Sequence, residues 1–310
     1  MNMLIIRPAA LGDTLMLAPA LIQLRHTASV TLVGGVPGID HVRGLVDVCL
    51  DFEAPGWHSL FTDAPDLPGL PPAALLVAFL RDPDRRVKRS LKAVFPEAQV
   101  HVFPGLPPDE EDGHVALYLA RCLEAAGAKV DAQRCFEEAC WRALLRGEWS
   151  PPGAGRIILH PGSGGCEKNH PPEFWFDLVC ALNDSPLSGG RGVLLLLGPA
   201  EESVRPFFET RLKHPGMEIL VTPGKEELVS VLGSARLYLG HDSGITHLAA
   251  MMGAPTLALF RDSSIRRWRP LGPRVKVIQN RKHCAGLVFD VMEEAKSLIG
   301  EDVGIGWGDH

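Results

Sequence analysis

The sequence has few of the features that mark membrane-spanning, secreted or nucleic-acid-binding proteins. The apolar run 192–198 is too short to cross a bilayer, and no long apolar segment follows the amino terminus, so we expect neither a transmembrane segment nor a signal peptide. An excess of basic residues is also missing, since the formal net charge is −6, which argues against a nucleic-acid partner. We therefore expect a cytoplasmic protein that works, at most, at the inner face of the cytoplasmic membrane.

Cysteine and cofactor motifs are equally sparse. The seven cysteines are odd in number and never form a Cys-x-x-Cys pair, so they predict reduced thiols rather than a disulfide framework or a zinc site. No strand-to-helix turn contains Gly-x-Gly-x-x-Gly and no Walker loop is present, so a nicotinamide dinucleotide is not indicated. With 310 residues, of which 46% are hydrophobic, the chain is long enough for two hydrophobic cores.

The clearest pattern in the chain is the segment 237–260. It predicts a short strand, a tight polar turn at 240–244, a helix and a second strand at 256–260. Asp242 or Ser243 can cap the first amides of the helix. A helix that starts there directs unpaired N–H groups, and roughly half a positive charge, at any ligand above the strand ends, which favours an anion such as phosphate. The alternative is a well-capped turn without a ligand.

The amino-terminal end repeats this pattern. An apolar strand at 3–6 is followed by a turn that contains Asp13, a helix that runs through Leu24, and a second strand at 30–34. Asp13 can be a helix-start residue that interacts with the helix dipole. It can equally be a general base exposed at the carboxyl edge of a parallel sheet, where open α/β folds bind ligands.

Basic residues gather at 81–92, directly after a predicted strand at 75–80. Asp82 and Asp84 in this segment match the Asp-x-Asp metal motif of some sugar transferases. The proline between them and the arginines on both sides favour a turn that opens a basic helix, so no metal site is expected. The basic face is either solvated or contacts an anionic partner. Residues 36–72 follow no pattern that we can assign.

A stretch rich in proline and glycine, 150–155, is the best candidate for a linker. It divides the chain into a domain of residues 1–150 and a domain of residues 151–310. The second domain opens with a strand that ends in the glycine- and serine-rich loop 161–165, and Lys168 follows. Glycines let backbone amides approach a phosphate, and a lysine supplies a mobile positive charge. Repeated strand-turn-helix units after this loop favour a doubly wound α/β fold with a parallel sheet.

Three motifs stand in order along the chain. They are Leu-Gly-Asp at 11–13, His-Pro-Gly-Ser-Gly at 160–164 with Lys168 and Pro171, and Asp-Ser-Gly-Ile-Thr-His-Leu-Ala-Ala at 242–250 with Gly-Ala-Pro-Thr at 253–256. Together they resemble the family 9 glycosyltransferases, the heptosyltransferases of lipopolysaccharide core assembly. The segment 268–273 is also similar to the family's pattern, so the resemblance extends from Leu4 to about Gly272.

This resemblance implies a GT-B architecture, in which two Rossmann-like domains with parallel sheets face each other across a cleft. The first domain is expected to hold the acceptor and the second the nucleotide-sugar, while the last helix could pack back on the first domain. Family members transfer L-glycero-D-manno-heptose from an ADP donor to a lipid A–Kdo or inner-core acceptor, with inversion and without an obligatory metal or a cofactor. The implied partner is therefore an anionic glycolipid at the inner membrane.

The same resemblance assigns roles to individual residues. Asp13 matches the position of the catalytic base, Lys168 matches a lysine that contacts the donor phosphates, and Glu226 lies near a glutamate that reaches the nucleoside. The other candidate donor contacts are Ser163, Gly164, Asp242, Ser243, Gly244, Thr246 and His247. The candidate acceptor contacts are Arg85, Arg86, Lys88 and Arg89.

Two of these candidates need a more specific interpretation. The carboxylate of Asp242 would repel a phosphate, so we expect it to cap the helix or to bind backbone while the following amides meet the anion. His247, one turn into the helix, either donates to the phosphate or is a buried polar residue bonded to a neighbouring loop.

Two positions depart from the family pattern. His170 stands where the family usually has tryptophan, and Arg261 replaces a common glycine, so both bear on the base and sugar preference. A nucleotide-sugar epimerase or hydrolase on the same fold, or a non-catalytic nucleotide-sugar binder, are the alternative functions. Asp13 argues against the binder, because binding alone requires no base.

Overall fold

The computed structural model of the protein describes residues 1–67, 69–145, 155–165, 169–280 and 286–300. The chain forms two compact units, Met1–Cys140 and Trp141–His310. Leu144 and Leu145 belong to the second unit, because their amides donate to the carbonyl of Met251 at 2.7 and 3.0 Å. The predicted linker lies almost wholly outside the described residues, so the domain boundary at residue 150 stays a prediction.

A parallel five-stranded sheet forms the centre of the first unit, in the order β3-β2-β1-β4-β5. The strands are β1 (Asn2–Arg7), β2 (Ser29–Gly34), β3 (Val48–Asp51), β4 (Leu75–Phe79) and β5 (Gln99–Phe103). The helices are α1 (Leu11–Leu15), α2 (Ala18–Leu24), α3 (Gly38–Val42), α4 (Arg86–Val94), α5 (Val115–Ala125) and α6 (Ala132–Trp141), with the 3₁₀ turns η1 (Arg43–Leu45) and η2 (Trp57–Phe61). Every residue of β4 is buried, as expected for a central parallel strand.

The core of the first unit joins segments that are distant in sequence. Trp57 and Leu60 of η2 pack with Leu91 of α4 against the side chains of β1 and β4. This packing places η2 beside α4, which becomes relevant for the basic residues of that helix.

Two features of the first unit differ from the sequence-based expectation. The single helix predicted through Leu24 is wrong, because the chain forms α1 and α2 instead. Pro19 lies in the first turn of α2, and a proline inside a continuous helix would clash with the carbonyl four residues earlier. The unassigned residues 36–72 contain α3, β3 and η2. β3 is an edge strand that is at best half-buried, so it gives no apolar run in the sequence.

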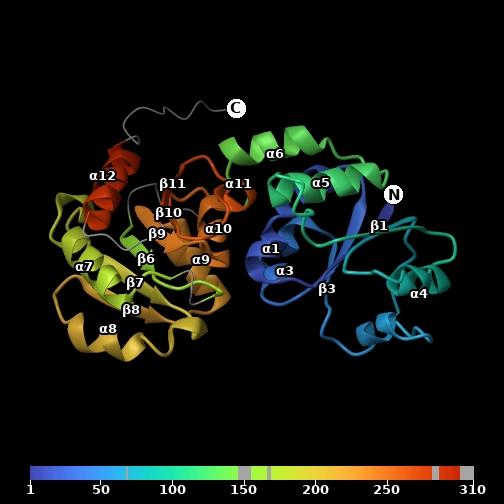
Figure 1. The fold of residues 1–310 in the computed structure, drawn as a ribbon, viewed down its shortest axis with the longest axis horizontal. Coiled ribbons are helices and arrows are strands. Elements are labelled where there is room, and N and C mark those ends of the chain that lie inside the picture. The colour runs from blue at the N-terminus through green and yellow to red at the C-terminus, as the bar shows by residue number, and fades with distance from the viewer. Residues whose placement is uncertain (68, 146–154, 166–168, 281–285, 301–310) are drawn as a thin grey trace. The chain divides into compact units, whose positions relative to one another are not determined.

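The second unit contains a parallel six-stranded sheet in the order β11-β10-β9-β6-β7-β8. The strands are β6 (Ile157–His160), β7 (Val193–Leu197), β8 (Met217–Val221), β9 (Leu237–His241), β10 (Thr256–Phe260) and β11 (Val275–Gln279). The helices are α7 (Pro172–Asn183), α8 (Arg205–Arg211), α9 (Lys225–Gly233), α10 (Gly244–Met251), α11 (Ile265–Trp268) and α12 (Leu287–Gly300), with the 3₁₀ turns η4 (Pro186–Ser188) and η5 (Pro199–Glu201). Figure 1 shows α7 and α12 on one face of this sheet and α9 and α10 on the other.

The last helix belongs to the core of the second unit. Leu287, Val291, Ala295 and Leu298 of α12 are buried against α7 and the sheet. Their spacing of three and four residues places them on one face of the helix, which is the face that the core covers. Among the described residues, none of the helices combines the length and the apolarity that crossing a membrane requires.

The start of β7 depends on two glycines with positive φ. Gly192 has a φ of 76°, and a methyl group at this position would overlap the carbonyl of Gly216, which accepts a bond from Val193. Gly190 has a φ of 72° but open space around it. We predict that Gly190→Ala lowers the free energy of unfolding by about 1 kcal/mol, from the backbone conformation alone.

Gly192→Ala should cost about 3 kcal/mol, because steric overlap adds to the same conformational penalty. Urea unfolding of both variants measures the difference. Equal losses would contradict the close approach of β7 and β8 at Gly216.

Candidate functional site

The carboxyl ends of β6 and β9 form the centre of the site in the second unit. The two strands are adjacent and parallel, and His160 is in register with Gly240. The strand order reverses between them, because the chain moves outward from β6 to β8 on one side and from β9 to β11 on the other. Open parallel sheets bind ligands at such a reversal, beyond the carboxyl ends of the strands. The loops that leave β6 and β9 therefore carry the candidate ligand contacts.

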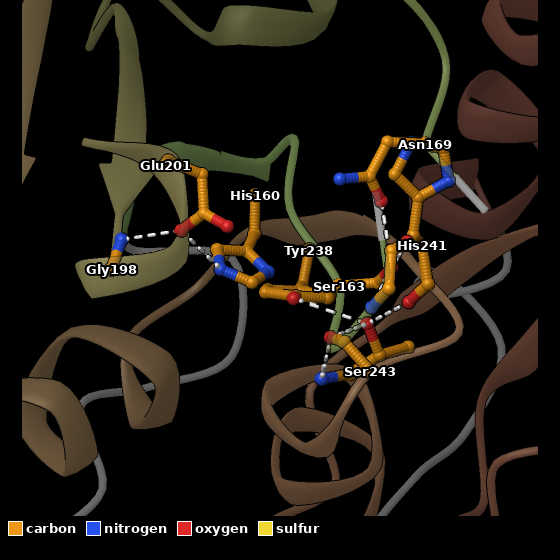
Figure 2. A network of polar contacts seen from close by, with 10 residues as sticks. His160, Ser163, Asn169, Gly198, Glu201, Tyr238, His241 and Ser243 are labelled. Carbon is orange, nitrogen blue, oxygen red and sulfur yellow. Dashed lines mark hydrogen bonds and ion pairs between the residues drawn. The ribbon is translucent and has the colours of Figure 1, made fainter. Parts of the chain in front are cut away.

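The helix after β9 begins at the predicted turn, and Ser243 is its cap. The hydroxyl of Ser243 accepts a hydrogen bond from the amide of Thr246 at 3.3 Å. The Thr246 hydroxyl donates to the carbonyl of His241 and lies 3.2 Å from the phenol oxygen of Tyr238 (Figure 2). Thr246 is fully buried, so its contribution in this structure is to join α10 to the end of β9.

The first amides of α10 point away from the helix. The first bond of the helical ladder joins the amide of His247 to the carbonyl of Ser243 at 3.1 Å. Gly244 and Ile245 precede it, so helix geometry directs their amides outward beyond the end of β9. These amides carry the partial positive charge of the helix N-terminus, which suits an anion.

Asp242 and His247 lie close together at the same helix start. The Oδ1 atom of Asp242 lies 3.6 Å from Nε2 of His247, and both side chains are largely buried. The ring of His247 also lies near Trp268, with ring centroids 6.3 Å apart. His247 is therefore buried beside Asp242, and its predicted donation to a phosphate stays a prediction.

The predicted loop after β6 is only partly described. Ser163 is buried, and its hydroxyl lies 2.7 Å from the side-chain oxygen of Asn169 and 2.9 Å from the carbonyl of Gly165 (Figure 2). Gly164 is exposed. Lys168 lies outside the described residues, so its role stays a prediction.

The far end of this loop is held by the two residues that depart from the family pattern. The amide of His170 donates to Nε2 of His241 at 2.9 Å, and the guanidinium of Arg261 donates to the carbonyl of Asn169. His170 is also stacked on His241, with ring centroids 5.2 Å apart. The loop from β6 is thereby joined to the ends of both β9 and β10.

His241 is a site residue that sequence analysis missed. It is 1% exposed and lies between His170 and Trp175. Burial, together with the charge of nearby His170, lowers the pKa of His241 to about 3. Because Nε2 accepts the bond from His170, the neutral ring carries its proton on Nδ1. The sequence held one signal, which is a polar residue at the end of an apolar strand.

Glu201 is a second missed residue. It ends η5 after β7, is 4% exposed, and its carboxylate lies 3.5 Å from Nε2 of His160. The amide of Gly198 donates to the same oxygen at 2.6 Å (Figure 2). Burial alone would raise the pKa of Glu201. The hydrogen bond and charge of His160, together with the hydrogen bond from the Gly198 amide, outweigh burial and hold the pKa of Glu201 below its ordinary value.

Glu226 lies apart from this centre. It is exposed in the first turn of α9, which follows β8, and β8 is separated from β6 by β7. The loops that carry the other described candidates therefore leave the adjacent strands β6 and β9, while Glu226 lies further along the same edge of the sheet.

In the first unit, Asp13 lies in the first turn of α1 with a third of its side chain exposed. Arg7, at the end of β1, is buried and holds this turn. Its Nε donates to the carbonyl of Asp13 at 3.0 Å, its Nη1 to the carbonyl of Gly105 at 2.8 Å, and its Nη2 lies 3.7 Å from the Asp13 carboxylate. Burial lowers the pKa of Arg7 to about 10, so the guanidinium stays charged at neutral pH.

The Asp-x-Asp pair of the first unit is part of a helix start. The carboxylate of Asp82 accepts bonds from the amides of Val87 and Lys88 at 2.9 and 3.0 Å. These contacts favour the predicted turn before a basic helix. In the part of the chain that the structure describes, no group of three His, Cys, Asp or Glu side chains is placed to hold a metal ion.

The predicted basic helix is α4. Arg85, Lys88 and Arg89 are exposed at its start, whereas Arg86 is partly buried and donates to the carbonyl of Phe61 at 3.2 Å. Arg89 also donates to the carbonyl of Asp84. The cluster therefore presents exposed cations, and Arg86 in addition joins α4 to η2.

Comparison with known proteins identifies one family. Residues 135–305 match glycosyltransferase family 9 (heptosyltransferase). No curated protein matches the sequence significantly.

Three solved structures resemble the whole chain. A family 9 glycosyltransferase from Veillonella parvula has 16% identity and a TM-score of 0.72, with 97% of each chain covered. The E. coli heptosyltransferase WaaC with ADP has 14% identity and a TM-score of 0.69, with 95% of this chain and 100% of that chain covered. The E. coli ADP-heptose lipopolysaccharide heptosyltransferase II has 17% identity and a TM-score of 0.71, with 98% and 100% covered. These matches confirm the predicted fold of two parallel-sheet domains of the GT-B heptosyltransferase type.

The buried His241 predicts a pH dependence of stability. Its pKa is about 3 in the folded chain and about 6.5 when unfolded, so the unfolded state takes up the proton first as the pH falls. Stability is therefore lost below about pH 6.5, and His241 should account for about 2 kcal/mol between pH 7 and pH 5. His241→Gln keeps an acceptor for the His170 amide but cannot titrate, so this part of the pH dependence should disappear.

Urea unfolding at both pH values, followed by tryptophan fluorescence, measures the effect. His26→Gln changes an exposed histidine and should leave the pH dependence unaltered. An unchanged pH dependence in His241→Gln would contradict the burial of a neutral ring.

Proposed function

The chain belongs to glycosyltransferase family 9, and on this premise we propose that it transfers heptose, or a related sugar, from an ADP-sugar to an inner-core lipopolysaccharide acceptor. The transfer inverts the anomeric centre and uses neither a metal nor a cofactor. The observation that carries the proposal is the junction of the β6 loop with the end of β9, just before α10, at the reversal of strand order. Both segments present groups suited to a diphosphate.

The donor diphosphate is proposed to bind above the ends of β6 and β9. The outward amides of Gly244 and Ile245, with the positive end of the α10 dipole, stabilise its negative charge. Lys168 adds a positively charged ammonium group. Together these groups stabilise the charge that develops on ADP as the sugar leaves, which is the task that a divalent cation performs in other transferases.

Asp242 would repel a phosphate that approached it directly. Because its carboxylate lies 3.6 Å from Nε2 of His247, the arrangement turns the negative charge toward that ring and away from the outward amides. Asp242 and His247 are therefore proposed to shape the start of α10. Asp242 itself does not contact the leaving group. Glu226, exposed on α9, is available for the nucleoside.

Acceptor activation is assigned to Asp13. Inverting transfer requires one base to remove the proton from the acceptor hydroxyl as its oxygen attacks the anomeric carbon. The Asp13 carboxylate is partly exposed, and Arg7 fixes the backbone at this residue, so the group is accessible and held in place. The proton moves from the hydroxyl to the carboxylate while the sugar–phosphate bond breaks, and ADP leaves with the bonding electrons.

The exposed cations of α4 are proposed to contact the acceptor. Arg85, Lys88 and Arg89 place three positive charges on a short surface in a chain whose net charge is −6. Phosphates and carboxylates of a lipopolysaccharide precursor match this surface in charge. Such exposed contacts weaken with salt, because ions screen charges in solvent.

Calorimetric titration with ADP, UDP and GDP in the presence of a chelator tests the donor site. We predict selective ADP binding without divalent metal, because the site neutralises the diphosphate with amides and a lysine. Lys168→Ala should weaken ADP binding by about tenfold or more, as expected when a charged partner of a phosphate is lost.

Lys213→Ala is the matched control, because Lys213 is exposed in the second unit but precedes β8, at the opposite edge of the sheet. It should bind ADP as the unaltered protein does. Binding that requires a metal, or equal affinity for all three nucleotides, would contradict the proposed donor site.

A further inference from the structure

A buried carboxylate lies under the loop that follows β6. Glu201 comes from η5, after the neighbouring strand β7, and its carboxylate is bonded to the Gly198 amide and paired with His160 (Figure 2). Its second oxygen faces Gly162, where a methyl group would overlap the carboxylate. The carboxylate is therefore enclosed by the end of β6, the first residues of its loop and the turn after β7.

The burial of this group needs an explanation beyond the end of a 3₁₀ turn. An ionised carboxylate opposes burial unless it is paired and hydrogen-bonded. The adjacent Glu202 shows the ordinary alternative, since 71% of its side chain is exposed. Glu201 is instead 4% exposed, with its partners at the reversal of strand order.

The contact with Gly162 has a direct consequence for the next residue. Ser163 bonds to Asn169, and the chain then meets the end of β9 through the amide of His170 and His241. α10 is joined to the same end of β9 through the hydroxyl of Thr246. The contact of Gly162 with the Glu201 carboxylate therefore sets where the start of this loop lies relative to the first turn of α10.

We propose that Glu201 is a positioning residue for the nucleotide-sugar: its side chain supports the loop at Gly162 and thereby fixes Ser163 beside the amides that receive the diphosphate. The proposal rests on the donor site proposed above. In this proposal, the loop is held by the length of the Glu201 side chain and not by its charge.

A double-mutant cycle on ADP affinity tests this role. Gly162→Ala should raise the dissociation constant for ADP at least tenfold, because the methyl group displaces the loop from Glu201. Glu201→Ala removes the support and should also weaken binding. In the Glu201→Ala background, however, Gly162→Ala should change the dissociation constant less than threefold, because the overlapping carboxylate is gone.

Two further variants separate length from charge and position from stability. Glu201→Gln keeps the length and an acceptor for the Gly198 amide, so it should bind ADP within threefold of the unaltered protein. Glu202→Ala, one residue away and exposed, should change the affinity less than twofold. All titrations are made well below the unfolding temperature of each variant, so that a purely structural role would leave the affinity of the folded protein unchanged.

The outcomes are distinct. An equal effect of Gly162→Ala in both backgrounds, or a loss in Glu201→Gln as large as in Glu201→Ala, would overturn the positioning role while leaving the donor site intact. If Glu201→Ala fails to fold alone, the proposal requires that the double variant folds, because the methyl group refills part of the space, and a double variant that does not fold would overturn it. Absence of ADP binding by the unaltered protein would overturn the proposed function and this role with it.

Discussion

The hydrogen bonding of β6 to β9 places two loops that are far apart in sequence on one edge of the second sheet, side by side. His160 and Gly240 are in register at the end of that ladder, so the loop after β6 and the turn after β9 begin at the same edge of the sheet. The bond from His170 to His241 depends on this neighbour relation, while the contact of Glu201 with His160 depends on the pairing of β6 with its other neighbour, β7. A different strand order would separate the amides of α10 from the glycine-rich loop, and the proposed diphosphate site would not form.

The candidate site is organised by buried polar contacts rather than by its ligand. His241 is neutral and accepts one amide, Glu201 is ionised between an amide and a histidine, and in the first unit Arg7 bridges two carbonyls beside Asp13. Each of these groups would oppose folding without its partners. Groups that are already fixed lose little freedom when a substrate binds, which is why such supports favour both affinity and catalysis.

Much of the fold could be predicted from local sequence patterns, whereas contacts between residues distant in sequence could not be predicted. The strand, turn and helix around Ser243 depend on neighbours in sequence, and the structure confirms the strand, the cap and the second strand. His241 could not be assigned, because its partner His170 is 71 positions away. The break between α1 and α2 was accessible from Pro19, whereas the edge strand β3 is too exposed to leave an apolar run. The roles of Asp13 and Lys168 rest on the family resemblance.

The most direct test of the account is the stoichiometry of ADP release and acceptor glycosylation. The protein is incubated with ADP-heptose, with and without a lipid A–Kdo acceptor, and ADP and the acceptor mass are followed together. The account predicts one ADP released for each glycosylated acceptor, no release without acceptor, and loss of both in Asp13→Asn, which still binds ADP. Release of ADP without an acceptor, or a changed sugar that stays attached to ADP, would contradict sugar transfer and indicate a hydrolase or an epimerase.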